Sequence, residues 1–113
     1  MVLYEISELA LYTIEQELTS VQVVMRSNVA LSPVLGCIKS ARLVERTLRH
    51  FGVETVYHAA AYKHVPLVEH NIAEGVRNIV LGTATLAEAA IAAGVKSFIL
   101  ISSDKSVRPT NIM

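Results

Sequence analysis

The chain has no tryptophan, a single cysteine and no glycine cluster. One cysteine excludes an internal disulfide framework and is compatible with a reducing compartment. Its five glycines, at positions 36, 52, 75, 82 and 94, form neither GxGxxG nor a P-loop, so the loop that holds phosphates in dinucleotide-binding sheets is missing. No apolar run approaches 18 residues, and the first twenty residues carry acids. These features argue against a transmembrane helix and against a secretory signal.

An excess of charge of one sign is also absent. Ten Lys and Arg balance ten Asp and Glu, which argues against a nucleic-acid or membrane-surface binder. Charged residues make up 18% and hydrophobic residues 52%, with a mean hydropathy of +0.45. This composition predicts a globular chain whose strands are buried on both faces. Three histidines six residues apart do not form a compact metal-binding helix face, so no metal site is predicted.

Apolar runs of strand length alternate with helical periodicity along the 113 residues. Gly52 and Gly94 stand where helix C-termini favour a left-handed residue. Residues 21–25 are a candidate for an extra strand. The predicted strands are 1–4, 31–38, 53–58 and 97–102, and the predicted helices lie after Ser7, around residues 44–51 and over 73–93.

Two stretches, FGVETVYHAAA and AGVKSFILISS, share one order: helix end, Gly-Val, buried strand, small residues. Strands that alternate with helices imply right-handed crossovers and a parallel sheet. The predicted fold class is therefore α/β, with a doubly wound parallel sheet. Ligands bind such sheets beyond the carboxyl ends of the strands, which selects residues 5–7, 58–64 and 102–105.

Each of these strand ends has a chemical and a structural interpretation. Ala59-Ala60-Ala61 lets a flat ligand approach the backbone, or serves tight helix–strand packing. Glu5 can accept hydrogen bonds from a ribose diol, or is a solvated acid at a helix start. Ser103-Asp104-Lys105 offers a hydrogen-bond donor, a general acid and a general base, or holds a solvated ion pair of small energetic value.

Four stretches, YEISELALYTIEQEL, VYHAAAYKHVPLVEHN, EGVRNIVLGT and LISSDKSVRPTNIM, resemble a known family. They look like the catalytic domain of bacterial UDP-N-acetylglucosamine 4,6-dehydratases, the polysaccharide-biosynthesis branch of the extended short-chain dehydrogenase/reductases. HAAAYKHVP together with S-D-K-x-V-x-P-x-N is specific to that branch. The resemblance implies that residues 1–113 are a single, partial NAD-binding Rossmann-like domain. This domain lacks the first strand and the Gly-rich loop and is a fragment of a larger enzyme.

The resemblance also implies an NAD(P) cofactor, with NAD expected rather than NADP, and it assigns the residues that contact this cofactor. Glu5 matches the acid that binds the adenosine ribose, and Ile38 lies in the segment that flanks the adenine. Ala59-Ala60-Ala61 and Ser102 match positions beside the cofactor. Because the cofactor is regenerated in each cycle, it is expected to stay bound.

For the reaction, the resemblance places Tyr62, Lys63 and His64 in a loop near the nucleotide-sugar site. Ser103 corresponds to the active-site hydroxyl, Asp104 to the general acid and Lys105 to the general base. The Tyr of the family's YxxxK motif falls at Met113, as in a subgroup in which that Tyr is replaced by Met.

Two other functions stay open at this stage. One is a related NAD-dependent nucleotide-sugar epimerase, disfavoured because epimerases use the Tyr that Met113 replaces. The other is a non-catalytic nucleotide-binding α/β module. The expected partner is a UDP-sugar substrate, with no nucleic acid and no membrane contact from this segment. A homo-oligomer of the full-length protein is compatible with the family. The expected location is the cytoplasm, with any membrane anchor outside these residues.

Overall fold

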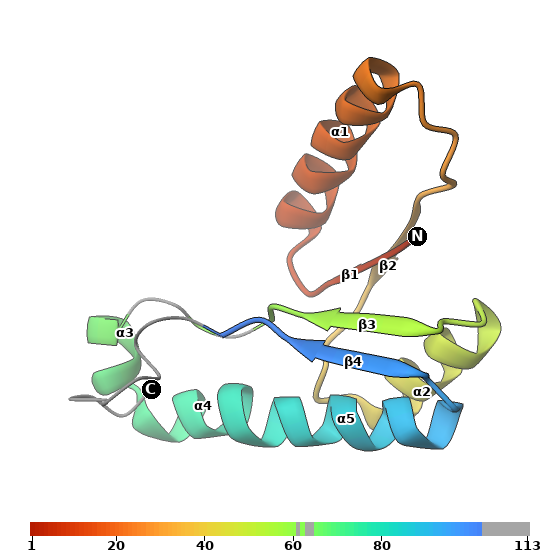
Figure 1. Cartoon of the computed structure of the whole chain (residues 1–113). Coiled ribbons are helices and arrows are strands. Elements are labelled where there is room, and N and C mark those ends of the chain that lie inside the picture. Colours follow the sequence, from red (N-terminus) through yellow and green to blue (C-terminus); the bar gives the residue numbers. More distant parts are fainter. Residues whose placement is uncertain (61, 63–64, 103–113) are drawn as a thin grey trace. The chain divides into compact units, whose positions relative to one another are not determined.

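The computed structural model describes residues 1–60, 62 and 65–102 (Figure 1). The chain divides into two compact units, residues 1–37 and residues 38–113. Each unit contains one pair of parallel strands.

The first unit consists of β1 (Val2–Glu5), α1 (Glu8–Met25) and β2 (Ser32–Leu35). The strands pair in parallel from Val2↔Ser32 to Glu5↔Leu35. Helix α1 begins at Ser7, whose hydroxyl accepts a hydrogen bond from the Ala10 amide at 3.3 Å. This is the N-cap interaction that satisfies one of the free amides of the first turn.

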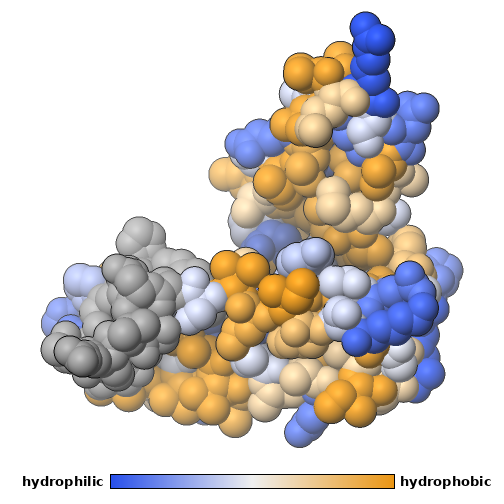
Figure 2. All heavy atoms as spheres, in the orientation of Figure 1, coloured by the Kyte–Doolittle hydropathy of each residue, from blue (hydrophilic) through white to orange (hydrophobic). Residues whose placement is uncertain are grey.

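The candidate strand at residues 21–25 is wrong, because α1 continues through these residues to Met25. Their β-branched side chains favour strands only weakly, and a helix already capped and propagating overrides that preference. Arg26 then ends the helix in a left-handed conformation, with φ of 51°. Figure 2 shows apolar side chains over α1, and Leu9, Val23, Val24 and Met25 are all more than 70% exposed.

The second unit contains the remaining elements. Its strands β3 (Thr55–His58) and β4 (Ser97–Leu100) pair in parallel from Thr55↔Ser97 to His58↔Leu100. Its helices are α2 (Ala41–His50), α3 (Val65–Glu69), and a continuous helix made of α4 (Ile72–Val76), the π-helical turn η1 (Arg77–Leu81) and α5 (Gly82–Ala93).

Helices α2 and α5 lie against each other on one face of the β3–β4 pair (Figure 1). Their facing side chains form the core together with residues from β3 and α3. Gly82 allows a close approach, since an added Cβ would lie 2.8 Å from Cδ1 of Ile38. As expected from the sequence, Gly52 and Gly94 take positive φ, at 56° and 77°. The buried apolar residues of this unit are Ile38, Val44, Leu48, Val56, Val68, Leu86, Ala89 and Ala90.

The predicted fold class is confirmed as a partial Rossmann-like α/β sheet. In the Rossmann strand order 3-2-1-4-5-6, the second strand pairs with the third and the fourth with the fifth. The pairs β1–β2 and β3–β4 match these two pairs.

The continuous helix of residues 72–93 is long and apolar enough, by length and composition, to cross a membrane. Charged and polar residues interrupt its apolar positions, so no unbroken apolar run marks it in the sequence. Leu86, Ala89 and Ala90 are buried in the core of the second unit.

Candidate functional site

The carboxyl ends of β3 and β4 lie side by side. The pairing His58↔Leu100 is followed by a hydrogen bond from the Ile101 amide to the His58 carbonyl, at 2.9 Å. The segments that begin at Ala59 and at Ser102 therefore leave the sheet at the same edge. Parallel sheets bind ligands at this edge.

His58 is the buried polar residue of this edge, with 2% of its surface exposed. Its Nε2 lies 2.9 Å from the Thr83 hydroxyl on α5. A buried imidazole is costly unless it is hydrogen-bonded, so this contact ties the last residue of β3 to the helix.

Tyr62 lies in the segment after β3 and contacts the same helix twice. Its backbone amide donates to Asn78 Oδ1 at 3.2 Å, and its hydroxyl lies 3.4 Å from Glu74 Oε1. Tyr62, which the resemblance places in a loop near the nucleotide-sugar site, therefore contacts a helix of its own unit through its backbone and its hydroxyl.

Glu74 also joins the segment after β2 to this cluster. Lys39 Nζ lies 2.9 Å from Glu74 Oε1. The hydrogen bond from Lys39, together with its positive charge, lowers the pKa of the Glu74 carboxyl. Because both side chains are about 40% exposed, the pair orients the segment more than it stabilises the fold.

The strand end of the first unit places Glu5 beside the start of α1. Its Oε1 accepts a hydrogen bond from the Ser7 amide at 2.9 Å. In the same unit, the Tyr4 hydroxyl donates to the Cys37 carbonyl at 3.2 Å. Burial raises the pKa of the Tyr4 phenol, and Cys37 adds to this effect.

The predicted site residues thus fall into four groups, one of which is Glu5 at the end of β1. Ala59, Ala60, Tyr62 and Ser102 gather at the carboxyl edge of β3–β4. Ile38 is buried against Gly82 in the core of the second unit. The other predicted site residues besides Glu5 lie outside the described residues: Ala61, Lys63, His64, Ser103, Asp104, Lys105 and Met113.

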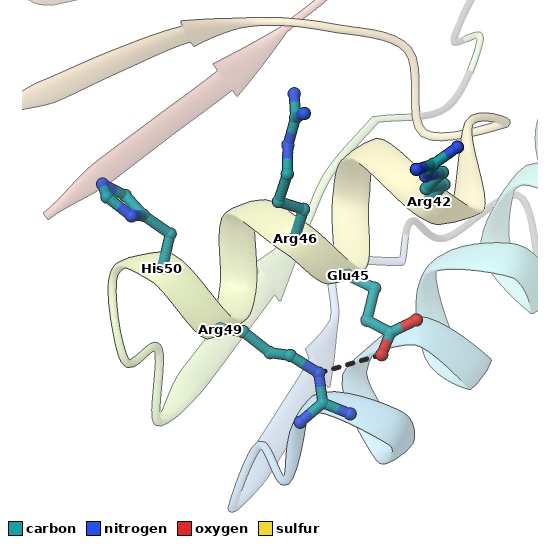
Figure 3. A pocket seen from close by; sticks show the side chains of 5 residues that line it. All are labelled: Arg42, Glu45, Arg46, Arg49 and His50. Atoms are coloured by element: carbon teal, nitrogen blue, oxygen red, sulfur yellow. Dashed lines mark hydrogen bonds and ion pairs between the residues drawn. The ribbon is translucent and has the colours of Figure 1, made fainter.

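A shallow depression lies on the solvent face of α2 (Figure 3). Arg42, Glu45, Arg46, Arg49 and His50 line it, and Arg49 Nε lies 2.9 Å from Glu45 Oε1. None of the predicted site residues lines this depression. Its wall comes from one helix face, and we assign it no role in the site.

Three residues that contact β3 or the segment after it were not predicted from the sequence: Glu74, Asn78 and Thr83. An α-helical projection does not place Thr83 on the same side as the other two. The usable signal was the presence of isolated polar residues in an otherwise apolar helix.

Parallel strand pairs with helices packed on them, and polar groups at the carboxyl edge, are the features of a Rossmann-like α/β protein. The chain itself belongs to the polysaccharide biosynthesis protein family, whose family model matches residues 1–113.

The curated relatives of this chain include proteins with different names. The capsular polysaccharide biosynthesis protein CapD of Staphylococcus aureus is 39% identical over 106 residues, which are 94% of this chain and 17% of that protein. The UDP-glucose 4-epimerase of Rickettsia canadensis is 30% identical over 112 residues, which are 99% of this chain and 32% of that protein. The chain thus spans at most about a third of these relatives.

Solved structures share the fold. Pen from Bacillus thuringiensis matches with a TM-score of 0.81 and 28% identity, over 98% of this chain and 33% of that chain. The UDP-glucose 4-epimerase of Bifidobacterium longum, solved with NAD+ and UDP, matches with a TM-score of 0.73 and 21% identity, over 92% and 30%. The second likeness shows the fold alone.

Proposed function

We propose that this chain is part of an NAD-dependent nucleotide-sugar 4,6-dehydratase of surface polysaccharide synthesis, acting on a UDP-N-acetylglucosamine-type substrate. We further propose that the 113 residues alone are inactive. The observation that carries the proposal is the register of β3 and β4. Because of this register, the Ala59-Ala60 segment and the Ser102 segment both begin at the carboxyl edge of the strand pair. Ser103, Asp104 and Lys105 come directly after Ser102 in the sequence.

Groups in each unit fit an NAD cofactor by their chemistry. The Glu5 carboxylate accepts the Ser7 amide with one oxygen, and its second oxygen can accept a ribose hydroxyl. Ala59 and Ala60 carry only methyl side chains, so a ligand can approach their backbone. When bound, NAD would oxidise the sugar at C4 and later return the electron pair at C6.

The acid–base steps fall to residues of this chain. Once C4 is a ketone, the proton on C5 is acidic, and Lys105 as a neutral amine removes it. Asp104 as a neutral acid protonates the C6 hydroxyl, which leaves as water while the C5–C6 double bond forms. Ser103 supplies the active-site hydroxyl. These roles follow from the family resemblance and from the chemistry of three adjacent side chains.

The test uses the full-length protein with UDP-N-acetylglucosamine. Lys105→Ala should lower turnover by about 10²–10⁴-fold, because a general base acts in the transition state. Substrate affinity should change little. Asp104→Asn should behave in the same way, since the amide keeps the shape but cannot donate the proton. Near-normal turnover in Lys105→Ala would contradict the catalytic assignment and would favour the alternative, in which Asp104 and Lys105 form a solvated ion pair.

A second candidate is a nucleotide-sugar 4-epimerase. It is favoured by the similarity to the Rickettsia canadensis epimerase, which extends over 99% of this chain. Mass spectrometry of the product separates the two activities, because dehydration removes one water from the sugar and epimerisation leaves the mass unchanged.

We also propose a cytoplasmic location for this segment. Its helix of residues 72–93 packs against α2 in the second unit, and nucleotide sugars with a reversibly reduced cofactor fit that compartment. A protease-protection assay on bacterial spheroplasts, with an epitope after residue 102, would place the segment on one side of the membrane.

A further inference from the structure

Three polar side chains of one continuous helix hold the end of β3 and the segment after it. Thr83 contacts His58, the last residue of β3, at 2.9 Å. Asn78 accepts the Tyr62 amide at 3.2 Å, and Glu74 lies 3.4 Å from the Tyr62 hydroxyl. The helix thus contacts the chain at two points, at His58 and at Tyr62.

An uninterrupted α-helix would not place these three side chains on one side. At about 100° per residue, Asn78 lies about 40° from Glu74, but Thr83, nine residues on, lies about 180° away. The π-helical turn between them changes this. Its amide–carbonyl bond, from the Gly82 amide to the Arg77 carbonyl, spans five residues instead of four. The additional residue turns the rest of the helix back by about 100°, so Thr83 comes within about 80° of Glu74.

The hydroxyl of Thr83 also behaves differently from four other helical hydroxyls in the described part of the chain. A hydroxyl inside a helix commonly donates to the carbonyl four residues earlier. Four hydroxyls do so here, each at 2.8 or 2.9 Å: those of Thr13, Thr19, Ser20 and Thr47. Thr83 instead contacts the buried His58.

We propose that the π-helical turn is a positioning device, and that Asn78 and Thr83 are positioning residues for the backbone at His58 and Tyr62. Asn78 fixes this backbone through the Tyr62 amide, and Thr83 fixes it through the His58 ring. A ligand at this edge of the sheet meets that backbone, so its affinity depends on residues that do not touch it. The inference goes beyond the proposed function, because it concerns the shape of the edge and not the reaction.

The first test measures amide hydrogen exchange by NMR on the ¹⁵N-labelled 113-residue chain. Asn78→Ala should speed exchange of the Tyr62 amide by about 2- to 10-fold, the range expected for one hydrogen bond. Asn78→Asp keeps an acceptor oxygen and should restore most of the protection. The amides of Val56 and Ile99, in β3 and β4, serve as internal references and should not change.

The second test measures the His58 ring signals. Thr83→Val removes the hydroxyl at nearly constant volume and should shift the ¹⁵Nε2 resonance, whereas Thr83→Ser should keep it. Thr85→Val is the matched control, since Thr85 lies on the same helix, is also half-buried, and its hydroxyl makes no hydrogen bond within the described part of the chain. This control should leave the His58 signals in place.

The wild-type chain alone can overturn the proposal, even if a variant fails to fold. A Tyr62 amide that exchanges as fast as in an unstructured peptide contradicts the Asn78 contact. In the full-length protein, Asn78→Ala should raise the KM more than it lowers kcat, with rescue by Asn78→Asp. That kinetic test rests on the proposed function, whereas the exchange and ring measurements do not, so the two failures are distinguishable.

Discussion

The two units of the chain are built from the same strand arrangement but differ in what covers it. Each has one pair of parallel four-residue strands. Among residues 1–37, all of which the structure describes, Leu11 is the one buried residue. The second unit buries eight apolar residues from β3, α2, α3, α5 and the segment before α2. Strand pairing alone therefore does not make a core in this chain.

The helices explain this difference. Helix α2 places its charged residues on one face and buries Val44 and Leu48 on the other. Helix α1 carries apolar residues on opposite faces, because the exposed Leu9 and Val24 lie on the side away from the buried Leu11. The first unit therefore leaves much of the apolar surface of its helix exposed to solvent.

The largest expected effect compares two leucines that are equally buried, each 8% exposed. Leu48→Ala should lower the free energy of unfolding of the second unit by about 2–4 kcal/mol, because its neighbours on α5 cannot close the cavity. Leu11→Ala should cost about 1 kcal/mol or less, because the side chains around it already face solvent. Urea unfolding followed by residue-specific NMR signals in each unit measures both. Equal losses would contradict the contrast between the units.

A smaller effect concerns Tyr4 in the first unit. Burial raises the pKa of its phenol, so the folded state holds the proton more tightly than the unfolded state. The resulting stabilisation is complete below the ordinary pKa of about 10 and is lost as the pH rises through the higher folded value. The first unit should therefore lose structure at alkaline pH before the second. Tyr4→Phe should abolish this difference, which far-UV circular dichroism and NMR can follow.

The smallest effect concerns Glu74 in the second unit. Its pKa is lowered by Lys39, so the pair contributes above the ordinary carboxyl pKa and is lost as the pH falls through the lowered folded value. Lys39→Met should raise the pKa of Glu74 toward its usual range. Glu88, an exposed carboxyl on α5, provides the control. A ¹³C carboxyl titration measures both residues, and an unchanged Glu74 would exclude the Lys39 pair in solution.

Much of the fold could be predicted from local patterns. Ser7 before an apolar periodicity marked the start of α1, and Gly52 and Gly94 marked two helix ends through their left-handed geometry. The strands are shorter than predicted: residues 31–38 were expected, whereas β2 covers only Ser32–Leu35. Apolar residues beyond a strand look the same in sequence whether they pair or, like Ile38, turn into the core.

The candidate site could be predicted only in part. The strand ends at Ala59 and Ser102 follow from the topology of a parallel sheet. The contacts that hold these ends depend on the rotation of one helix. A π-helical turn changes that rotation, and its own residues, 77–81, include no Gly or Pro, although Gly82 directly follows the turn. Asn78 and Thr83 were therefore invisible to a periodicity of 3.6 residues.

The π-helical turn also has a consequence for the alignment of homologous sequences. A related chain with an unbroken α-helix here needs one residue fewer between the counterparts of Glu74 and Thr83 to present them in the same directions. An ungapped alignment of two such chains would pair each position on one side of residues 77–81 with a neighbour of its true counterpart. The gap belongs inside the turn, and the residues equivalent to Asn78 and Thr83 should be sought from opposite sides of it.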